Sequence, residues 1–143
     1  MAKDKNFDEL KEWLILFLKH KDLFYKKIVD IKEKDGILIV EQKENTQYFA
    51  ILPHLDVVDK LLDDYKDKQI CIVTFNTKPN FDIIINSWKK LSELPMLCIY
   101  FVNPNSSTEK KWIIYPFTHS KITEHSALKQ GLMTLFESVE EYK

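Results

Sequence analysis

The sequence predicts a single α/β domain over residues 1–143, with helices on both faces of a mixed sheet. An antiparallel meander of three strands should be followed by parallel strands. Three observations lead to this class: the hydrophobic period alternates between helical and strand spacing, Asp35-Gly36 separates two short β-rich segments, and two continuous apolar runs, 70–75 and 96–102, each follow a helical stripe. The expected order is helix, three strands, helix, strand, helix, strand, strand and helix.

The first helix is expected at about residues 7–23. Its apolar residues recur at helical spacing: Phe7, Leu10, Trp13, Leu14, Phe17 and Leu18. Asn6 and Glu9 match the pattern of a capping box at the start of this helix. One face of the helix should therefore pack against the sheet.

Three strands are expected next, at about 26–33, 36–43 and 46–52. Asp-Gly favours a two-residue hairpin turn, which fixes the pairing of the first two strands. This register places Asp30 opposite Glu41 and Ile28 opposite Lys43. A turn at Asn45-Thr46 then leads into the third strand and completes the meander.

The second half alternates helices with buried strands, which is typical of parallel strands joined by right-handed crossovers. One helical stripe (Leu55, Val58, Leu61, Leu62, Tyr65) precedes the run 70–75, and another (Phe81, Ile84, Ile85, Trp88, Leu91) precedes the run 96–102. A polar loop at 103–111, a short strand at 112–115 and a closing helix from Thr118 onward complete the chain. No repeat or change of composition marks a second domain.

The composition excludes several mechanisms. All 21 basic residues are lysines, so bidentate arginine recognition of phosphate or guanine is absent. The net charge of -1 gives no general attraction to nucleic acid or to anionic membranes, which disfavours a nucleic-acid partner. Only two glycines occur, Gly36 and Gly131, so neither a P-loop nor a dinucleotide fingerprint can be formed.

We expect a cytoplasmic protein, because no apolar run reaches the length of a membrane span and the lysine-rich start has no apolar core of a signal peptide. Cys71 and Cys98 lie inside apolar runs and lack the spacing of a zinc site, so we expect both to be core thiols. The longest uncharged apolar run, 13–18, is far shorter than the roughly 18 residues of a membrane span. We therefore expect no membrane partner.

One charged cluster on the expected hairpin has the spacing of a metal-nuclease site. Asp30 is followed after ten residues by Glu41-x-Lys43. This pattern resembles the restriction-endonuclease-like family, in which the acidic pair binds Mg²⁺ and the lysine assists the attacking water. The resemblance implies Asp30 and Glu41 as ligands of Mg²⁺ or Mn²⁺ and Asp30, Glu41 and Lys43 as catalytic residues. It covers about 14 residues, and it departs from the family by placing Glu-x-Lys on the second strand instead of the third.

A second interpretation of the same cluster needs no metal. Lys32 and Lys43 are diagonal neighbours of the two carboxylates and could neutralise them as exposed cross-strand pairs. The strand order also resembles the ribonuclease-H-like core, which implies Asp30 as a first-strand carboxylate. In that comparison Glu124 with His125 is a loose match to a late acidic site, and Asn76 stands where another acid is expected.

A third group of residues follows the last parallel strand. Asn103, Trp112, Tyr115 and His119 belong to a segment rich in aromatic and polar side chains that could line a pocket or bind a partner. In the alternative interpretation Trp112 packs into the core. A small-molecule site is also possible near Asn76 and Asn103, because ligands favour the carboxyl ends of parallel strands.

These observations favour a non-catalytic binding or assembly module that has a protein partner or forms a homo-oligomer. The aromatic content of 13% provides side chains for such an interface. The alternative is a nuclease-like domain, active or degenerate, that depends on Mg²⁺ or Mn²⁺. No cofactor is expected outside that alternative.

Overall fold

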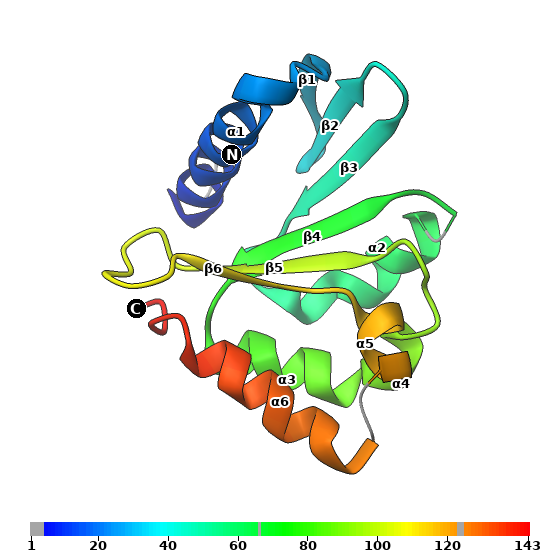
Figure 1. Ribbon diagram of the computed structural model, residues 1–143, viewed down its shortest axis with the longest axis vertical. Helices are drawn as coiled ribbons and strands as arrows, with labels where there is room; N and C mark the ends of the chain where they lie inside the picture. The colour runs from blue at the N-terminus through cyan, green and yellow to red at the C-terminus, as the bar shows by residue number, and fades with distance from the viewer. Residues whose placement is uncertain (1–4, 66, 123–124) are drawn as a thin grey trace.

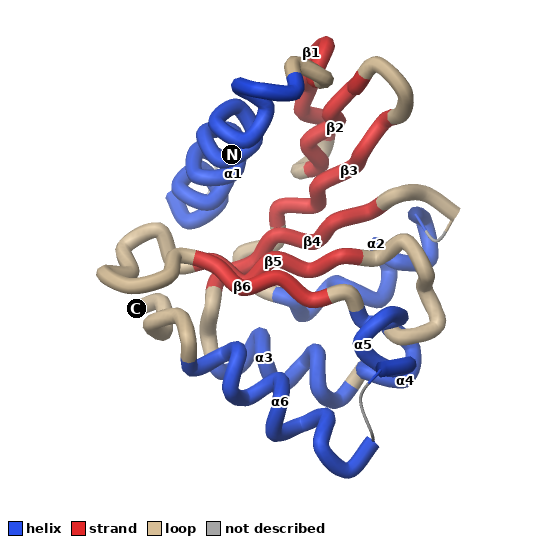
Figure 2. The backbone as a smooth tube through the Cα atoms, in the orientation of Figure 1, coloured by secondary structure: helices blue, strands red, loops and turns tan. Residues whose placement is uncertain are grey.

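The computed structural model describes residues 5–65, 67–122 and 125–143 and contains a six-stranded mixed sheet (Figures 1 and 2). The strands lie side by side in chain order: β1 (Ile28–Lys34), β2 (Ile37–Gln42), β3 (Thr46–Ile51), β4 (Ile70–Phe75), β5 (Cys98–Val102) and β6 (Lys111–Ile114). The β1–β2–β3 meander is antiparallel, β3, β4 and β5 are parallel, and β6 is antiparallel to β5. The expected α/β class and the order of elements are confirmed.

Helices cover both faces of the sheet. α1 (Lys5–Tyr25) is the one helix of the described residues that covers the first face, as Figure 1 shows, and it buries Leu10, Leu14 and Leu18 against the sheet. The opposite face carries η1 (Leu55–Val57), α2 (Val58–Tyr65), α3 (Lys78–Asn86), α4 (Trp88–Leu91), α5 (Pro116–Ile122) and α6 (His125–Glu137). None of the helices in the described ranges is long and apolar enough to cross a membrane.

The hairpin turn determines the register of β1 and β2. Asp35 and Gly36 have positive φ values of 52° and 81°, which suit the two central residues of a type I′ turn. Asp30 lies opposite Glu41, as expected. Ile28, however, pairs with Gln42 and not with Lys43, because an irregularity between Ile28 and Asp30 shifts the register by one residue.

Several element boundaries differ from the expectation. α1 extends from Lys5 and includes Asn6, so Asn6 is not the residue that caps this helix. The expected third helix is divided into α3 and α4 at Ser87, whose ψ of 10° departs from helical geometry. The closing segment forms α5 and α6 instead of one helix, and Glu124 lies outside the described residues.

The carboxyl ends of the parallel strands are covered by the end of the chain itself. Asn76 follows β4, and its Nδ2 donates hydrogen bonds to the carbonyl oxygens of Phe136, Val139 and Glu140 at 3.2, 3.0 and 3.3 Å. Asn103 follows β5, and its Nδ2 donates to the same Glu140 carbonyl at 2.9 Å. These amides anchor the C-terminal segment across the edge that the sequence offered as one alternative for a small-molecule site.

Candidate functional site: a pocket between α1 and the sheet

The charged cluster on the hairpin contains its own cation. Asp30 and Glu41 are register partners, and Lys32 Nζ lies 3.3 Å from Glu41 Oε1 and 3.8 Å from Asp30 Oδ2. The hydrogen bond to Glu41, aided by the charges of both carboxylates, raises the pKa of Lys32. Lys43 is exposed just beyond the end of β2. Lys32 therefore occupies the position between the carboxylates that a metal ion would need.

The described residues contain no group of three or more histidine, cysteine or acidic side chains able to hold a metal ion. In restriction-endonuclease-like proteins the Glu-x-Lys pattern lies on the third strand. The third strand of this protein is β3, whose sequence is Thr-Gln-Tyr-Phe-Ala-Ile. β3 thus has neither a carboxylate nor a lysine. The resemblance does not extend to that strand.

The residues of the expected aromatic site lie in different environments. Trp112 is buried and stacks on Phe101 with ring centroids 4.4 Å apart, and Asn103 is buried beneath the C-terminal segment. His119 lies on α5, and its buried Nδ1 has no hydrogen-bond partner among the described residues. Tyr115 lines a pocket on the face of the sheet that α1 covers.

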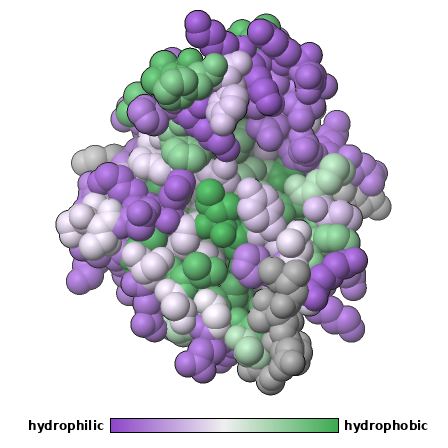
Figure 3. Space-filling view, in the orientation of Figure 1, coloured by the Kyte–Doolittle hydropathy of each residue, from purple (hydrophilic) through white to green (hydrophobic). Residues whose placement is uncertain are grey.

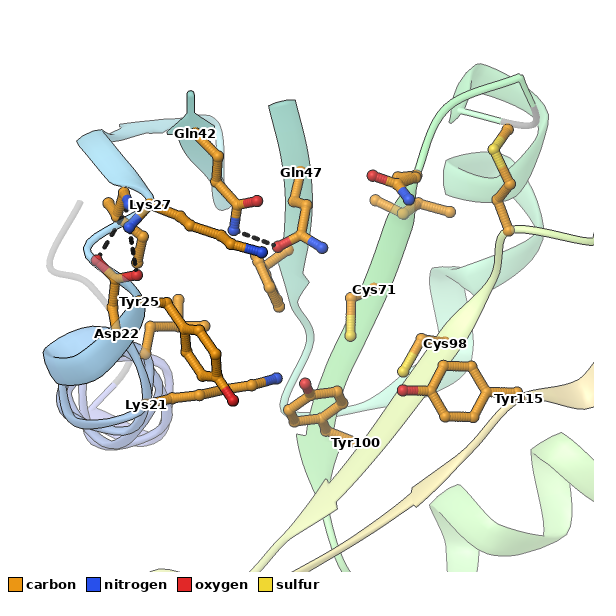
Figure 4. Close-up of a pocket in the computed structure, with 16 residues that line it drawn as sticks. Lys21, Asp22, Tyr25, Lys27, Gln42, Gln47, Cys71, Cys98, Tyr100 and Tyr115 are labelled. Carbon is orange, nitrogen blue, oxygen red and sulfur yellow. Dashed lines mark hydrogen bonds between the residues drawn. The ribbon is translucent and has the colours of Figure 1, made fainter. Parts of the chain in front are cut away.

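This pocket lies between α1 and the sheet and has a volume of about 540 Å³ (Figure 4). Its walls come from the end of α1, from strands β1 to β5 and from Tyr115 beyond β6. Ile70, Cys71 and Cys98 lie at the amino ends of β4 and β5, so the pocket lies at the end of the parallel strands opposite to Asn76 and Asn103. Leu18 and Phe49 add apolar surface from α1 and β3.

Two lysines extend into the pocket from the α1 side. Figure 4 shows the side chains of Lys21 and Lys27 directed toward the sheet. Neither ammonium forms an ion pair with a carboxylate of the described residues, although Lys27 Nζ lies 5.5 Å from the centre of the Tyr25 ring. Both cations are therefore available to a ligand.

Among the described residues, Asp22 is the single carboxylate of the pocket lining, and backbone groups already bind it. Its Oδ1 accepts a hydrogen bond from Lys27 N at 2.8 Å, and its Oδ2 accepts one from Ile28 N at 3.0 Å. These bonds hold the chain as it leaves α1 and enters β1. With Lys21 and Lys27 against Asp22, the lining has a formal charge of +1.

Three glutamine amides complete the polar part of the lining. Gln42 Nε2 donates to Gln47 Oε1 at 3.1 Å across the β2–β3 turn, and Asn45 Nδ2 donates to Gln69 Oε1 at 3.1 Å. Each amide is thus held in place by a neighbour through one of its polar atoms. Gln47 retains its two N–H donors, because it is the acceptor in its pair.

Three titratable groups that line the pocket, Cys71, Tyr100 and Tyr115, have raised pKa values. Cys71 and Cys98 are register partners on β4 and β5, and burial raises the pKa of the Cys71 thiol well above its usual range. Burial also raises the pKa of Tyr100. Electrostatic interaction with Cys98, followed by burial, raises the pKa of Tyr115 to about 12. The Cys71 thiol and the Tyr100 and Tyr115 phenols are therefore protonated near pH 7 and add no charge to Lys21, Lys27 and Asp22.

Sequence reasoning missed the pocket because its residues are distant in the chain and show no motif. Lys21 and Lys27 flank the end of α1, Gln42 and Gln47 flank a turn, and Gln69 precedes β4. The available signal was weak: Gln42, Gln47 and Gln69 lie near the ends of predicted strands.

Comparisons of the chain with protein-family models, curated proteins and solved structures found no match. Its function is therefore inferred from its own residues and their arrangement.

Proposed function

We propose that this protein is a non-catalytic binding module whose pocket between α1 and the sheet holds a small anionic molecule. The observation that carries the proposal is the convergence of Lys21 and Lys27, without carboxylate partners among the described residues, above an apolar floor. The favoured ligand has a phosphate or carboxylate group attached to an apolar body. The volume of about 540 Å³ falls within the range of small-molecule sites.

The two parts of the lining would recognise the two parts of such a ligand. The anionic group would pair with the Lys21 and Lys27 ammonium groups and accept a hydrogen bond from the Gln47 amide. The apolar body would lie against Phe49 and Tyr100. Lysines act as point charges without the fixed fork of arginine, so the arrangement suits a range of anionic groups.

Two observations support binding in preference to catalysis. The raised pKa of Cys71 disfavours the thiolate that a nucleophile requires. The alternative of a Mg²⁺- or Mn²⁺-dependent nuclease based on Asp30, Glu41 and Lys43 receives less support, because the Lys32 ammonium already lies between the carboxylates of Asp30 and Glu41.

Ligand-induced stabilisation tests this proposal. Phenyl phosphate at millimolar concentration should raise the melting temperature more than inorganic phosphate, and benzyl alcohol should have little effect, because binding to the folded state alone stabilises it. The Lys21→Met/Lys27→Met double variant should lose most of the phenyl phosphate effect. Lys89→Met, an exposed lysine on α4, is the matched control and should retain the effect. Equal stabilisation of all three proteins would overturn the proposal.

A further inference from the structure

β1 is an end strand of the sheet, and no strand of the described residues pairs with its outer edge. In a hairpin with a two-residue turn, the two residues that flank the turn form a hydrogen-bonded pair. Hydrogen-bonded and non-hydrogen-bonded pairs then alternate along the two strands. Lys34, Lys32 and Asp30 therefore direct their backbone groups toward β2, whereas Ile31 and Glu33 direct theirs outward. The Ile31 N–H is consistent with this assignment, since it donates to the Asp30 side chain (Oδ1, 2.9 Å).

Exposed apolar side chains flank this open edge. Phe24 is 92% exposed, Val29 65% and Leu23 63%, although all three are large hydrophobic residues. Leu23, Val29 and Ile31 line a groove of about 520 Å³ between the end of α1 and β1. Figure 3 shows hydrophobic side chains gathered over the end of α1 that leads into β1. Such a patch beside unpaired backbone groups favours an interaction surface.

The charges of β1 are complementary to those of a second β1 in one antiparallel register. When Ile31 faces Ile31 of a second copy, Asp30 of each copy lies directly opposite Lys32 of the other. If one β1 strand slides along the other by two residues in one direction, Asp30 lies opposite Asp30 of the second copy. If it slides by two residues in the other direction, Lys32 lies opposite Lys32. The register centred on Ile31 therefore gives two attractive pairs and no repulsive pair between these residues.

We infer that the protein forms a two-fold symmetric dimer in which β1 pairs with β1 of a second copy, centred on Ile31. The outward N–H and C=O groups of Ile31 would bond to those of its counterpart, so that a carbonyl replaces the Asp30 carboxylate on Ile31 N–H. The Asp30–Lys32 pairs would lie on the face without α1. The apolar contact of the two Ile31 side chains, flanked by Leu23 and Val29, would lie on the α1 face.

Reversal of single charges tests the register. Wild-type protein should sediment as a dimer at concentrations of tens of micromolar. Asp30→Lys places cations opposite each other and Lys32→Asp places carboxylates opposite each other, so each variant alone should be largely monomeric. An equimolar mixture of the two variants should form a heterodimer in native mass spectrometry, because every pair between copies then has opposite charges. The Asp30→Lys/Lys32→Asp double variant should again form a homodimer.

Control variants on α2 separate this interface from general charge effects. Lys60→Asp and Asp64→Lys change exposed residues of α2 and should leave the dimer intact. Circular dichroism confirms that each variant is folded. A monomeric wild-type protein, single variants that remain dimeric, or a mixture of folded variants without heterodimer would each overturn the inference. The pocket and its phenyl phosphate response do not depend on this interface, so the two proposals can fail separately.

Discussion

Trp112 Nε1 donates a hydrogen bond of 2.7 Å to Asn76 Oδ1 in the interior of the protein. The same Asn76 side chain donates to three carbonyl oxygens at the end of α6 and beyond it. One amide thus links β6 to the C-terminal segment and closes the carboxyl edge of the parallel strands. The pocket at the opposite edge remains open.

Replacement of Asn76 should therefore destabilise the fold. Asn76→Ala leaves the Trp112 N–H and several carbonyl groups without their buried partner, which should lower the free energy of unfolding by about 2–4 kcal/mol. Urea denaturation measures this change. Asn86→Ala, an exposed position at the end of α3, should change stability by less than about 0.5 kcal/mol. Similar effects at both positions would contradict an anchoring role for Asn76.

The two glycines should respond in opposite directions to alanine. Gly36 has a φ of 81°, so Gly36→Ala should cost about 1 kcal/mol through backbone strain. A Cβ at Gly36 would lie 3.8 Å from Phe7 Cε2, an ordinary contact that adds no clash. Gly131 lies within α6 with nothing within 4 Å of an added Cβ, so Gly131→Ala should stabilise the protein by about 0.5–1 kcal/mol. Thermal unfolding distinguishes the two signs.

Lys32 should control whether the hairpin can bind a divalent cation. Amide NMR of wild-type protein with Mn²⁺ should show no broadening centred on Asp30 and Glu41, because the Lys32 ammonium lies between their carboxylates. Lys32→Met removes that charge and should produce weak, localised broadening there. Localised broadening in the wild-type protein that disappears in Asp30→Ala would instead support the nuclease alternative.

Glu140 should show a depressed carboxyl pKa in solution. The side-chain and backbone hydrogen bonds from Ser107 lower its pKa below the ordinary value of 4.5. The carboxylate therefore contributes stability above about pH 4.5, and this contribution is lost as the pH falls through the lowered pKa. A ¹³C NMR titration of the Glu140 carboxyl group measures the midpoint. Ser107→Ala should return it to the ordinary range, and an unchanged midpoint would refute the assignment.

The arrangement of strands was predictable because local signals agreed with tertiary structure. The Asp35-Gly36 turn determines which residues of β1 and β2 face each other, so the Asp30–Glu41 pairing followed directly. The irregularity at Val29 was not predictable. It lies where Asp22 binds the backbone N–H groups of Lys27 and Ile28, and this contact requires knowing how α1 meets β1.

The candidate site was less predictable than the fold. Hydrophobic period shows which face of a strand is buried, but it does not show which edge of the sheet the chain itself covers. Asn76 and Asn103 follow parallel strands as ligand-binding residues often do, yet they bind the C-terminal backbone. The lysines of the pocket, Lys21 and Lys27, become neighbours of Gln47 only when α1 packs on the sheet.

An amide NMR titration with phenyl phosphate tests the central claim most directly. If the pocket binds anions with an apolar body, the largest shift changes should come from residues that line it, including Lys21, Gln47 and Cys98, and they should saturate together. The Lys21→Met/Lys27→Met variant should show small, unsaturated changes at the same residues. Changes spread over the surface, or equal in wild type and variant, would contradict a ligand site between α1 and the sheet.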